Sequence, residues 1–150
     1  MFDFILFKPI GKIANYDLEF LEVGTLPKDV FASCSDLQKG RSIVKKVKYL
    51  HYQLYTPEQG FLKLMAQNNC CLVVGLSDFF GIPPHEVVRR LISARILVRI
   101  AKKVGVSVRI FSLARNKNEI RDSNEIFWIG KFLGLDEAQL REGRDETVSW

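Results

Sequence analysis

The sequence contains few of the residues that most often build disulfide frameworks and metal centres. It has three cysteines and two histidines among its 150 residues. An odd number of cysteines without regular spacing is not typical of a secreted disulfide-bonded protein. Cys70 and Cys71 are adjacent, so in a strand their side chains point to opposite faces and are poorly placed to bind one metal ion together. We therefore expect Cys34, Cys70 and Cys71 to be buried structural thiols in a reducing compartment.

Long apolar runs are also missing. No segment reaches the roughly 18 uncharged apolar residues that cross a bilayer, so we expect no membrane partner. The first ten residues contain Asp3 and Lys8 within their apolar stretch and lack the pattern of a secretory signal peptide. Together these features predict a cytoplasmic location.

Familiar catalytic motifs are absent as well. His51 and His85 form no His-x-His pair, whereas a metal-dependent hydrolase of the barrel type needs several His and Asp ligands at strand ends. No Ser-His-Asp order stands out, and Gly130 and Gly134 form no phosphate loop. The aromatic motif of an RNA-recognition sheet does not appear either. We therefore expect no catalytic residues, no metal site and no cofactor bound by the protein itself.

What the sequence does contain is the composition of a globular protein, with 47% hydrophobic and 26% charged residues. This length can bury one substantial core, so we expect a single domain over residues 1–150. The patterns predict strands at 2–7, 18–23, 30–33, 49–55, 70–76 and 106–111, and helices at 57–67, 85–103, 123–133 and 136–142. Strands and amphipathic helices alternate in the second half, which favours an α/β fold with a parallel sheet.

Several helix boundaries have clear signals. Thr56 and Pro57 predict a helix start in which Thr56 is the N-cap and Pro57 takes the first helical position. Asp122 and Glu125 have the spacing of a capping box, with Asp in the capping role. Gly105 follows the longest helix, at the point where a left-handed residue commonly ends one. These signals fix the expected order of the elements.

Basic residues are distributed unevenly. The formal net charge is +5, but residues 85–117 contain nine Lys and Arg against a single acid, Glu86. A second basic run at 39–48 has five basic residues and no acid. Clustered cations release counterions from a phosphate backbone, which would favour RNA. The alternative is a solvated surface that only keeps the protein soluble.

On the longest helix, one face is expected to pack and both flanks are cationic. The apolar stripe comprises Val87, Leu91, Ala94, Val98 and Ala101. At 100° per residue the basic residues form two groups beside this stripe, Arg89 and Arg90 in one and Arg95, Arg99, Lys102 and Lys103 in the other. Such a helix could bind RNA or an acidic protein subunit.

The loop at residues 112–122 is the most unusual segment. It follows a buried strand and precedes a capped helix, so it lies at the carboxyl end of a parallel strand, where α/β folds place functional loops. Arg115, Lys117 and Arg121 would converge there. The alternative is a structural loop in which Glu119 or Asp122 pairs with Arg121 and orders the turn.

Residues 70–143 resemble the carboxyl-terminal half of a known family. An apolar strand ends in Leu76-Ser77-Asp78-Phe79-Phe80, an Arg-rich helix closes with Ala101-Lys-Lys-Val-Gly-Val, and a strand leads into Ser112-Leu-Ala-Arg115. Glu119-Ile-Arg121 follows, and the next helix ends in Leu133-Gly-Leu135. In this order, the motifs resemble the thirty-kilodalton protein subunit of archaeal and eukaryotic ribonuclease P, protein component 3. The chain has Asp122-Ser123 where the family usually has Ser-Pro, and it is shorter than a typical member.

The resemblance implies a TIM-barrel-like (β/α) fold, reduced or incomplete, with a parallel sheet and outer helices. It also implies a non-catalytic subunit of ribonuclease P, the endoribonuclease that removes the 5′ leader of precursor tRNA. In that family the RNA subunit supplies the catalytic metal site, where magnesium is expected, and the protein pairs with another small protein subunit. Precursor tRNA would be an indirect partner. Two alternatives remain: a degenerate metal-dependent barrel hydrolase, and a basic protein–protein scaffold.

The residues that we expect to contact RNA come from three segments. They are Arg115, Lys117 and Arg121 in the loop, Arg89, Arg90, Arg95 and Arg99 on the longest helix, and Lys45, Lys46 and Lys48 in the preceding basic run. The three loop residues are predicted because they occupy matching positions in the family. The four helix residues correspond only loosely to the Arg-rich helix of the family, and the three lysines are predicted from their charge alone.

Overall fold

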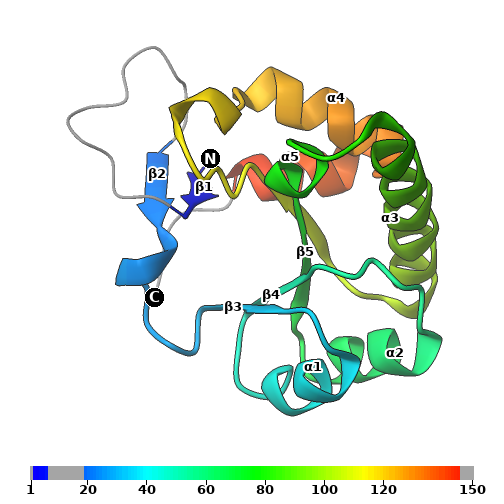
Figure 1. Ribbon diagram of the computed structural model, residues 1–150. Helices are drawn as coiled ribbons and strands as arrows, with labels where there is room; N and C mark the ends of the chain where they lie inside the picture. Colours follow the sequence, from blue (N-terminus) through cyan, green and yellow to red (C-terminus); the bar gives the residue numbers. More distant parts are fainter. Residues whose placement is uncertain (1, 7–18, 146–150) are drawn as a thin grey trace.

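The computed structural model describes residues 2–6 and 19–145, which contain six strands and five α-helices, and strands and α-helices alternate from β3 to α4 (Figure 1). The strands are β1 (Phe2–Ile5), β2 (Glu19–Glu22), β3 (Phe31–Cys34), β4 (Tyr49–Tyr52), β5 (Cys71–Gly75) and β6 (Val108–Phe111). The α-helices are α1 (Leu37–Ile43), α2 (Gln59–Gln67), α3 (Pro84–Val104), α4 (Ser123–Leu133) and α5 (Glu137–Asp145). Short 3-10 helices are η1 (Val23–Thr25), η2 (Leu76–Phe79) and η3 (Lys117–Glu119). The predicted end of the first strand at residue 7, the predicted start of the second at residue 18 and the charged tail at 146–150 lie outside the described residues.

All the strand pairs are parallel, as the alternation of strands and helices predicts. β3, β4, β5 and β6 form one sheet in that order, and β1 pairs with β2 in a second sheet. The two sheets meet where Ile5 bridges Ala114, and the Leu6 N–H donates to the Ala114 carbonyl at 2.8 Å. β1 therefore lies beside the continuation of β6. Among the described residues no ladder joins β2 to β3, so what the structure shows there is a parallel α/β fold.

One face of the strands packs around a cluster of aromatic side chains. The Phe4 ring lies 5.2 Å from Phe31, 5.5 Å from Tyr49 and 4.5 Å from Phe111, measured between centroids. These four rings come from β1, β3, β4 and β6, so the strands curl around them. We call this the inner cluster. Its buried members are Phe4, Val30, Tyr49, Cys71, Val73, Phe111 and Leu113.

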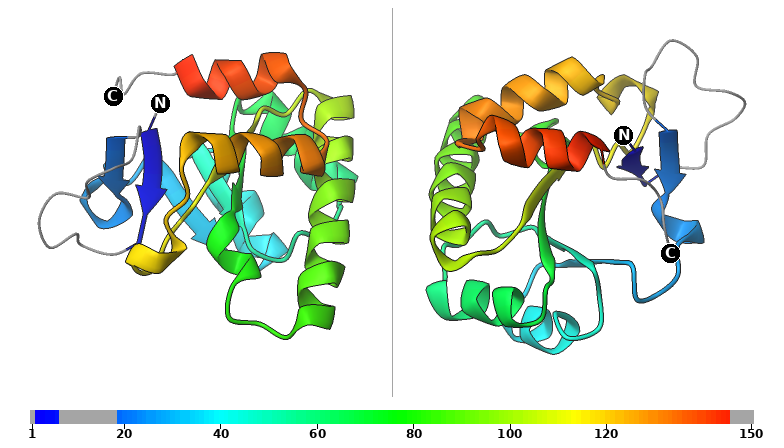
Figure 2. Two further views of the ribbon diagram at one scale, coloured as in Figure 1. Left: turned by 90° about the horizontal axis from the view of Figure 1, so that it is seen from above. Right: turned by 180° about the vertical axis from the view of Figure 1, so that it is seen from behind.

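The opposite face of the sheet carries a larger core under the helices. Side chains alternate along a strand, so Leu50 and Tyr52 of β4 enter this outer core while Tyr49 enters the inner cluster. Helices α1 to α4 supply the other half of the outer core, with Phe61 and Leu97 fully buried. The helices lie outside the strands, as expected, and β1 and β2 lie on the side away from α2 and α3 (Figure 1; Figure 2).

Helix α3 confirms most of its predicted boundaries and packing. It begins at Pro84 and ends at Gly105, whose φ of 83° is left-handed. Ala94, Val98 and Ala101 of the predicted stripe are buried, together with Leu97, which the stripe did not include. The opposite side of the helix faces solvent, and the basic residues flank the packed face as expected.

Two other helix predictions were wrong. Helix α2 begins at Gln59 because the Glu58 side chain accepts from the Gly60 and Phe61 N–H groups, so Thr56 is not the cap. Helix α1 lies in the basic run, for which no element was expected. It contains Gly40, whose missing side chain allows Phe61 and Cys34 to approach. By contrast, the capping box of Asp122 and Glu125 at the start of α4 is confirmed.

The three cysteines are free and buried, as predicted. Cys70 packs in the outer core and Cys71 in the inner cluster, so their side chains point to opposite faces. Burial raises the pKa of the Cys70 thiol to about 12. This thiol is therefore protonated and unreactive in the folded protein near neutral pH.

Candidate functional site

Polar side chains meet at the carboxyl ends of β3, β4 and β5, on the face that carries the inner cluster. The Nδ1 atom of His51 lies 3.0 Å from the Ser33 hydroxyl, and its Nε2 atom lies 2.6 Å from Asp78 Oδ2. The Tyr55 hydroxyl donates to the same carboxylate oxygen at 2.6 Å. His51 is buried and Ser33 is exposed. The structure therefore brings together a serine, a histidine and an aspartate that sequence reasoning had not connected.

The hydrogen bonds define how this cluster is protonated. Burial raises the pKa of Asp78, but hydrogen bonds from His51 and Tyr55 and the nearby Arg90 charge outweigh it, and the pKa falls below 3.8. Because an ionised carboxylate only accepts, His51 Nε2 donates to it, and when the ring is neutral Nδ1 accepts from the Ser33 hydroxyl. The hydrogen bonds of the cluster are thus made between side chains of this protein. They connect the carboxyl ends of β3 and β4 to η2.

A second buried polar pair joins the first strand to the loop after β6. The Asp3 carboxylate accepts from the N–H of Ser112 at 2.7 Å and also from its hydroxyl. Asp3 is completely buried, and this burial raises its pKa from 3.8 to about 7 despite the opposing hydrogen bonds. The pair fixes the position of the loop relative to β1.

We expect Asp3→Asn to remove a pH dependence of stability. The folded pKa of Asp3 is raised, so its contribution is complete below 3.8 and is lost as the pH rises through about 7. Within that window wild-type stability should fall by up to about 1.4 kcal/mol per pH unit from this group. Urea unfolding of both proteins between pH 4.5 and 7.5 measures the difference. If the free energy of unfolding changed with pH in the same way for the wild type and for Asp3→Asn, Asp3 would have an ordinary pKa in the folded chain.

The loop expected to contact RNA contains two arginines that also hold structure. Arg115 Nη2 donates to the Ser77 carbonyl at 2.7 Å, and its Nε pairs with Glu119 at 3.2 Å. The Arg121 guanidinium lies 4.5 Å from the centre of the Phe80 ring. Glu119 therefore does order the turn, but through Arg115 and not through Arg121. Lys117 is exposed at the start of η3.

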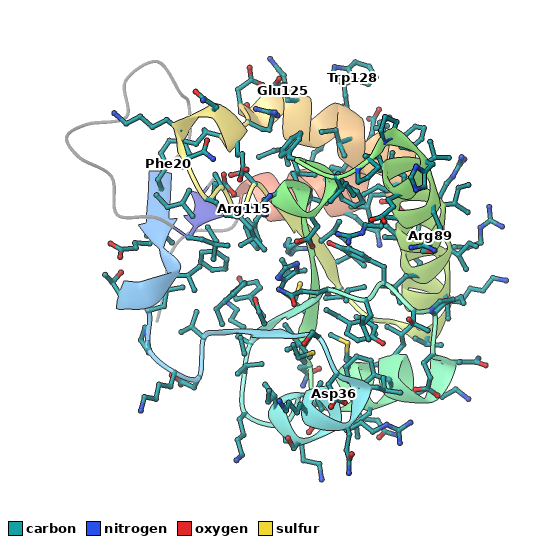
Figure 3. The ribbon with its side chains drawn as sticks, in the orientation of Figure 1. Phe20, Asp36, Arg89, Arg115, Glu125 and Trp128 are labelled. Atoms are coloured by element: carbon teal, nitrogen blue, oxygen red, sulfur yellow. The ribbon has the colours of Figure 1, made fainter. Side chains whose placement is uncertain are left out.

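The arginines of α3 differ in their surroundings. Arg90 Nη1 donates to the Asp78 carbonyl at 2.9 Å and so supports the same turn as Arg115. Arg95 lies 5.7 Å from the centre of the Phe132 ring on α4. Arg89 and Arg99 are exposed. Figure 3 shows Arg89 on α3, well away from Arg115 beside the strands.

The lysines of the basic run lie at the other end of the sheet. Lys45, Lys46 and Lys48 precede β4, whereas Arg115 and Lys117 follow β6, and the strands are parallel. Lys45 and Lys46 are exposed, and the Lys48 ammonium lies 5.0 Å from the Tyr49 ring centre. The predicted RNA-binding residues therefore form separate groups at the two ends of the strands and along α3, not one contiguous patch.

Metal-binding clusters and membrane-spanning helices are both lacking in the described ranges, 2–6 and 19–145. Within them no three His, Cys, Asp or Glu side chains lie close enough together to hold a metal ion. The helices of that part of the chain are all too short or too polar to cross a membrane.

Comparison with known proteins identifies similar folds only. Neither a family profile nor a curated protein matches the sequence. The fold is similar to a chain in a cryo-EM structure of archaeal ribonuclease P with mature tRNA, with a TM-score of 0.68 and 16% identity over 78% of this chain and 54% of that one. An uncharacterised protein with a crystal structure is also similar, with a TM-score of 0.52 and 19% identity over 74% of this chain and 30% of that one. The chain spans about half the length of the first of these chains, and it has the α/β fold of a protein found in an archaeal ribonuclease P structure.

Proposed function

We propose that this protein is a non-catalytic subunit of ribonuclease P that supports RNA-catalysed removal of the 5′ leader from precursor tRNA. The observation that carries the proposal is the fold similarity to a chain of archaeal ribonuclease P. The motif order in residues 70–143 supports the same family independently of the fold. The magnesium needed for cleavage would be held by the RNA subunit, and another small protein subunit would complete a hetero-oligomer.

The surface charges give this proposal a physical mechanism. Lys and Arg side chains that neutralise phosphates release counterions, so each contact adds affinity that falls as salt rises. The exposed members are suited to this task because their ammonium and guanidinium groups remain available, namely Lys117 after β6, Lys45 and Lys46 before β4, and Arg89 and Arg99 on α3. Arg90, Arg115 and Arg121 would act mainly by holding the loops in position. The separation of the groups favours an extended folded RNA over a short single strand.

Lys117→Ala is expected to weaken RNA binding without unfolding the protein. Removing one phosphate contact should lower the slope of log affinity against log salt by about 0.7–0.9. The measurement is binding of the full chain to ribonuclease P RNA over a salt series, together with 5′-leader cleavage by the reconstituted complex at low magnesium. Arg115→Ala should reduce activity and also thermal stability, because Arg115 holds η2.

The control for this experiment is Lys63→Ala, which removes an exposed lysine from α2, outside the predicted groups. It should bind and unfold like the wild type. If Lys117→Ala and Lys45→Ala both behave like Lys63→Ala at every salt concentration, the proposed RNA contacts are wrong. Purification of the tagged chain from its own cells at low salt should enrich ribonuclease P RNA, and an RNA-free preparation would contradict the proposed function itself.

A further inference from the structure

An apolar groove of about 420 Å³ lies between α3 and α4, separate from the polar cluster at the strand ends. Its floor is the η2 turn and the residue after it, and its walls are one side of each helix. The residues that line it are Leu76, Phe79, Phe80, Leu91, Trp128, Ile129 and Phe132. Every one of these side chains is apolar or aromatic, so the groove offers a ligand very few hydrogen bonds.

The apolar surface continues beyond the groove onto solvent-facing parts of both helices. Trp128 and Phe132 lie one turn apart on α4 and are 67% and 55% exposed. Trp128 points away from the body of the protein in Figure 3. Val88 and Ile92, one turn apart on α3, are each 56% exposed. Large apolar side chains that gather at one place, instead of being scattered singly, indicate a surface that a partner covers.

Cations border this apolar surface. Arg95 lies over the Phe132 ring and Arg121 lies over the Phe80 ring, at 5.7 and 4.5 Å from the ring centres. The acidic side chain nearest in sequence to Trp128 is Glu125, whose carboxylate accepts the N–H of Asp122 in the capping box. The rim therefore carries two guanidinium groups and the single carboxylate of Glu125, and its excess positive charge attracts acidic groups.

The floor of the groove is held rigidly by the network described above. Arg90 and Arg115 donate to main-chain oxygens of η2, and the Tyr55 ring stacks on Phe79 with centroids 5.7 Å apart. The Asp78 carboxylate anchors the same turn through His51. A preformed groove loses little conformational freedom on binding, which favours affinity.

We propose that this groove binds an amphipathic helix of a protein partner, with apolar residues facing the groove and Asp or Glu residues on its flanks. An apolar groove lined by residues of two helices suits a helix inserted by its apolar face. RNA fits less well, because the floor offers almost no donors for phosphates or base edges. A symmetric dimer of this chain would place the same cationic rim against itself, and like charges oppose that contact. The inference goes beyond the proposed function and does not require that the protein binds RNA.

A photo-crosslinking residue placed at Trp128 in the full-length chain tests the proposal in the protein's own cells. Trp128 is exposed, so its replacement should leave the fold intact. Mass spectrometry of the crosslinked peptide should identify a segment with apolar residues three and four apart and acidic flanking residues. The control is the same residue at Leu54, another exposed apolar position outside the groove lining, which should give at least tenfold less of this product.

A charge exchange then separates this docking from a chance encounter. Arg95→Glu should reduce the crosslink at least tenfold, and replacing an acidic flank of the identified segment by lysine should restore it. Crosslinks from Trp128 to RNA, to lipid or to a second copy of this chain would overturn the proposal, as would the absence of any product specific to Trp128. RNA binding by Phe132→Ala, a groove substitution outside the expected RNA contacts, measured in parallel keeps failure of the docking distinguishable from failure of the proposed function.

Discussion

Asp78→Ala is expected to lower the free energy of unfolding by about 3 kcal/mol, because it leaves two donors of a largely buried hydrogen-bonded network without their acceptor. The carboxylate accepts from His51 Nε2 and from the Tyr55 hydroxyl, both at 2.6 Å. The side chains of His51 and Asp78 are 2% and 16% exposed, so water replaces few of the lost contacts. The His51 ring would be left buried with an unpaired donor, which is the costly outcome. Urea unfolding at pH 7 measures the change.

Asp29→Asn provides the matched control, since it changes an exposed aspartate and should alter stability by less than about 0.5 kcal/mol. The pKa of Asp78 is lowered in the folded state, so its contribution is present above 3.8 and is lost as the pH falls through the folded value. The difference between wild type and Asp78→Ala should therefore shrink in acid below pH 3.8. A change no larger than that of the control would mean that the network does not stabilise the strand ends.

Phe4→Ala is expected to lower the free energy of unfolding by about 3–4 kcal/mol. Phe4 is fully buried and contacts aromatic rings from three other strands, Phe31, Tyr49 and Phe111. Its removal would leave a cavity that the strands cannot easily close, because backbone hydrogen bonds fix the distance between them. Phe4→Leu keeps most of the volume and should cost about 1 kcal/mol. Thermal and urea unfolding measure both changes.

Phe132→Ala is the control for this series, because its ring is 55% exposed and its loss creates no cavity. It should change stability by less than about 0.5 kcal/mol. If Phe4→Ala were no more destabilising than Phe132→Ala, β1 would not be part of the inner cluster. The fold would then rest on the sheet β3-β4-β5-β6 alone.

The sequence suggests the burial of Phe4 more readily than it suggests the contacts of Asp78. An apolar run at residues 2–7 predicts a buried strand, and Phe4 in that run is therefore expected to be buried. The contact between Ser33, His51 and Asp78 had no such signal, since the three residues are separated by other elements and no motif links them. The one available indication was a lone histidine, His51, within an apolar strand, and only the register of β3 against β4 places Ser33 opposite it.

The residues that we expected to contact RNA show the limit of reasoning from charge. Arg90, Arg115 and Arg121 were predicted to contact RNA together with Lys117, because all four are cationic and lie in a basic part of the chain, residues 85–121. Arg90 and Arg115 each donate a hydrogen bond to a main-chain oxygen of η2, and the Arg121 guanidinium lies over the Phe80 ring. Sequence cannot separate a lysine that faces solvent from an arginine that holds a turn, because the partner oxygens lie 12 residues from Arg90 and 38 residues from Arg115.

The sequence by itself determined the order of the strands and of every helix except α1, the parallel sheet, the capped ends of α3 and α4, and the burial of the cysteines. These features depend on local preferences and on apolar periodicity, which neighbouring residues express together. Only the tertiary structure decided that Asp3 meets Ser112 and that α1 forms around a close approach at Gly40. It alone placed the basic groups at opposite ends of the strands and left an apolar groove between α3 and α4. Such features arise where segments distant in the chain meet, and no local pattern encodes those distances.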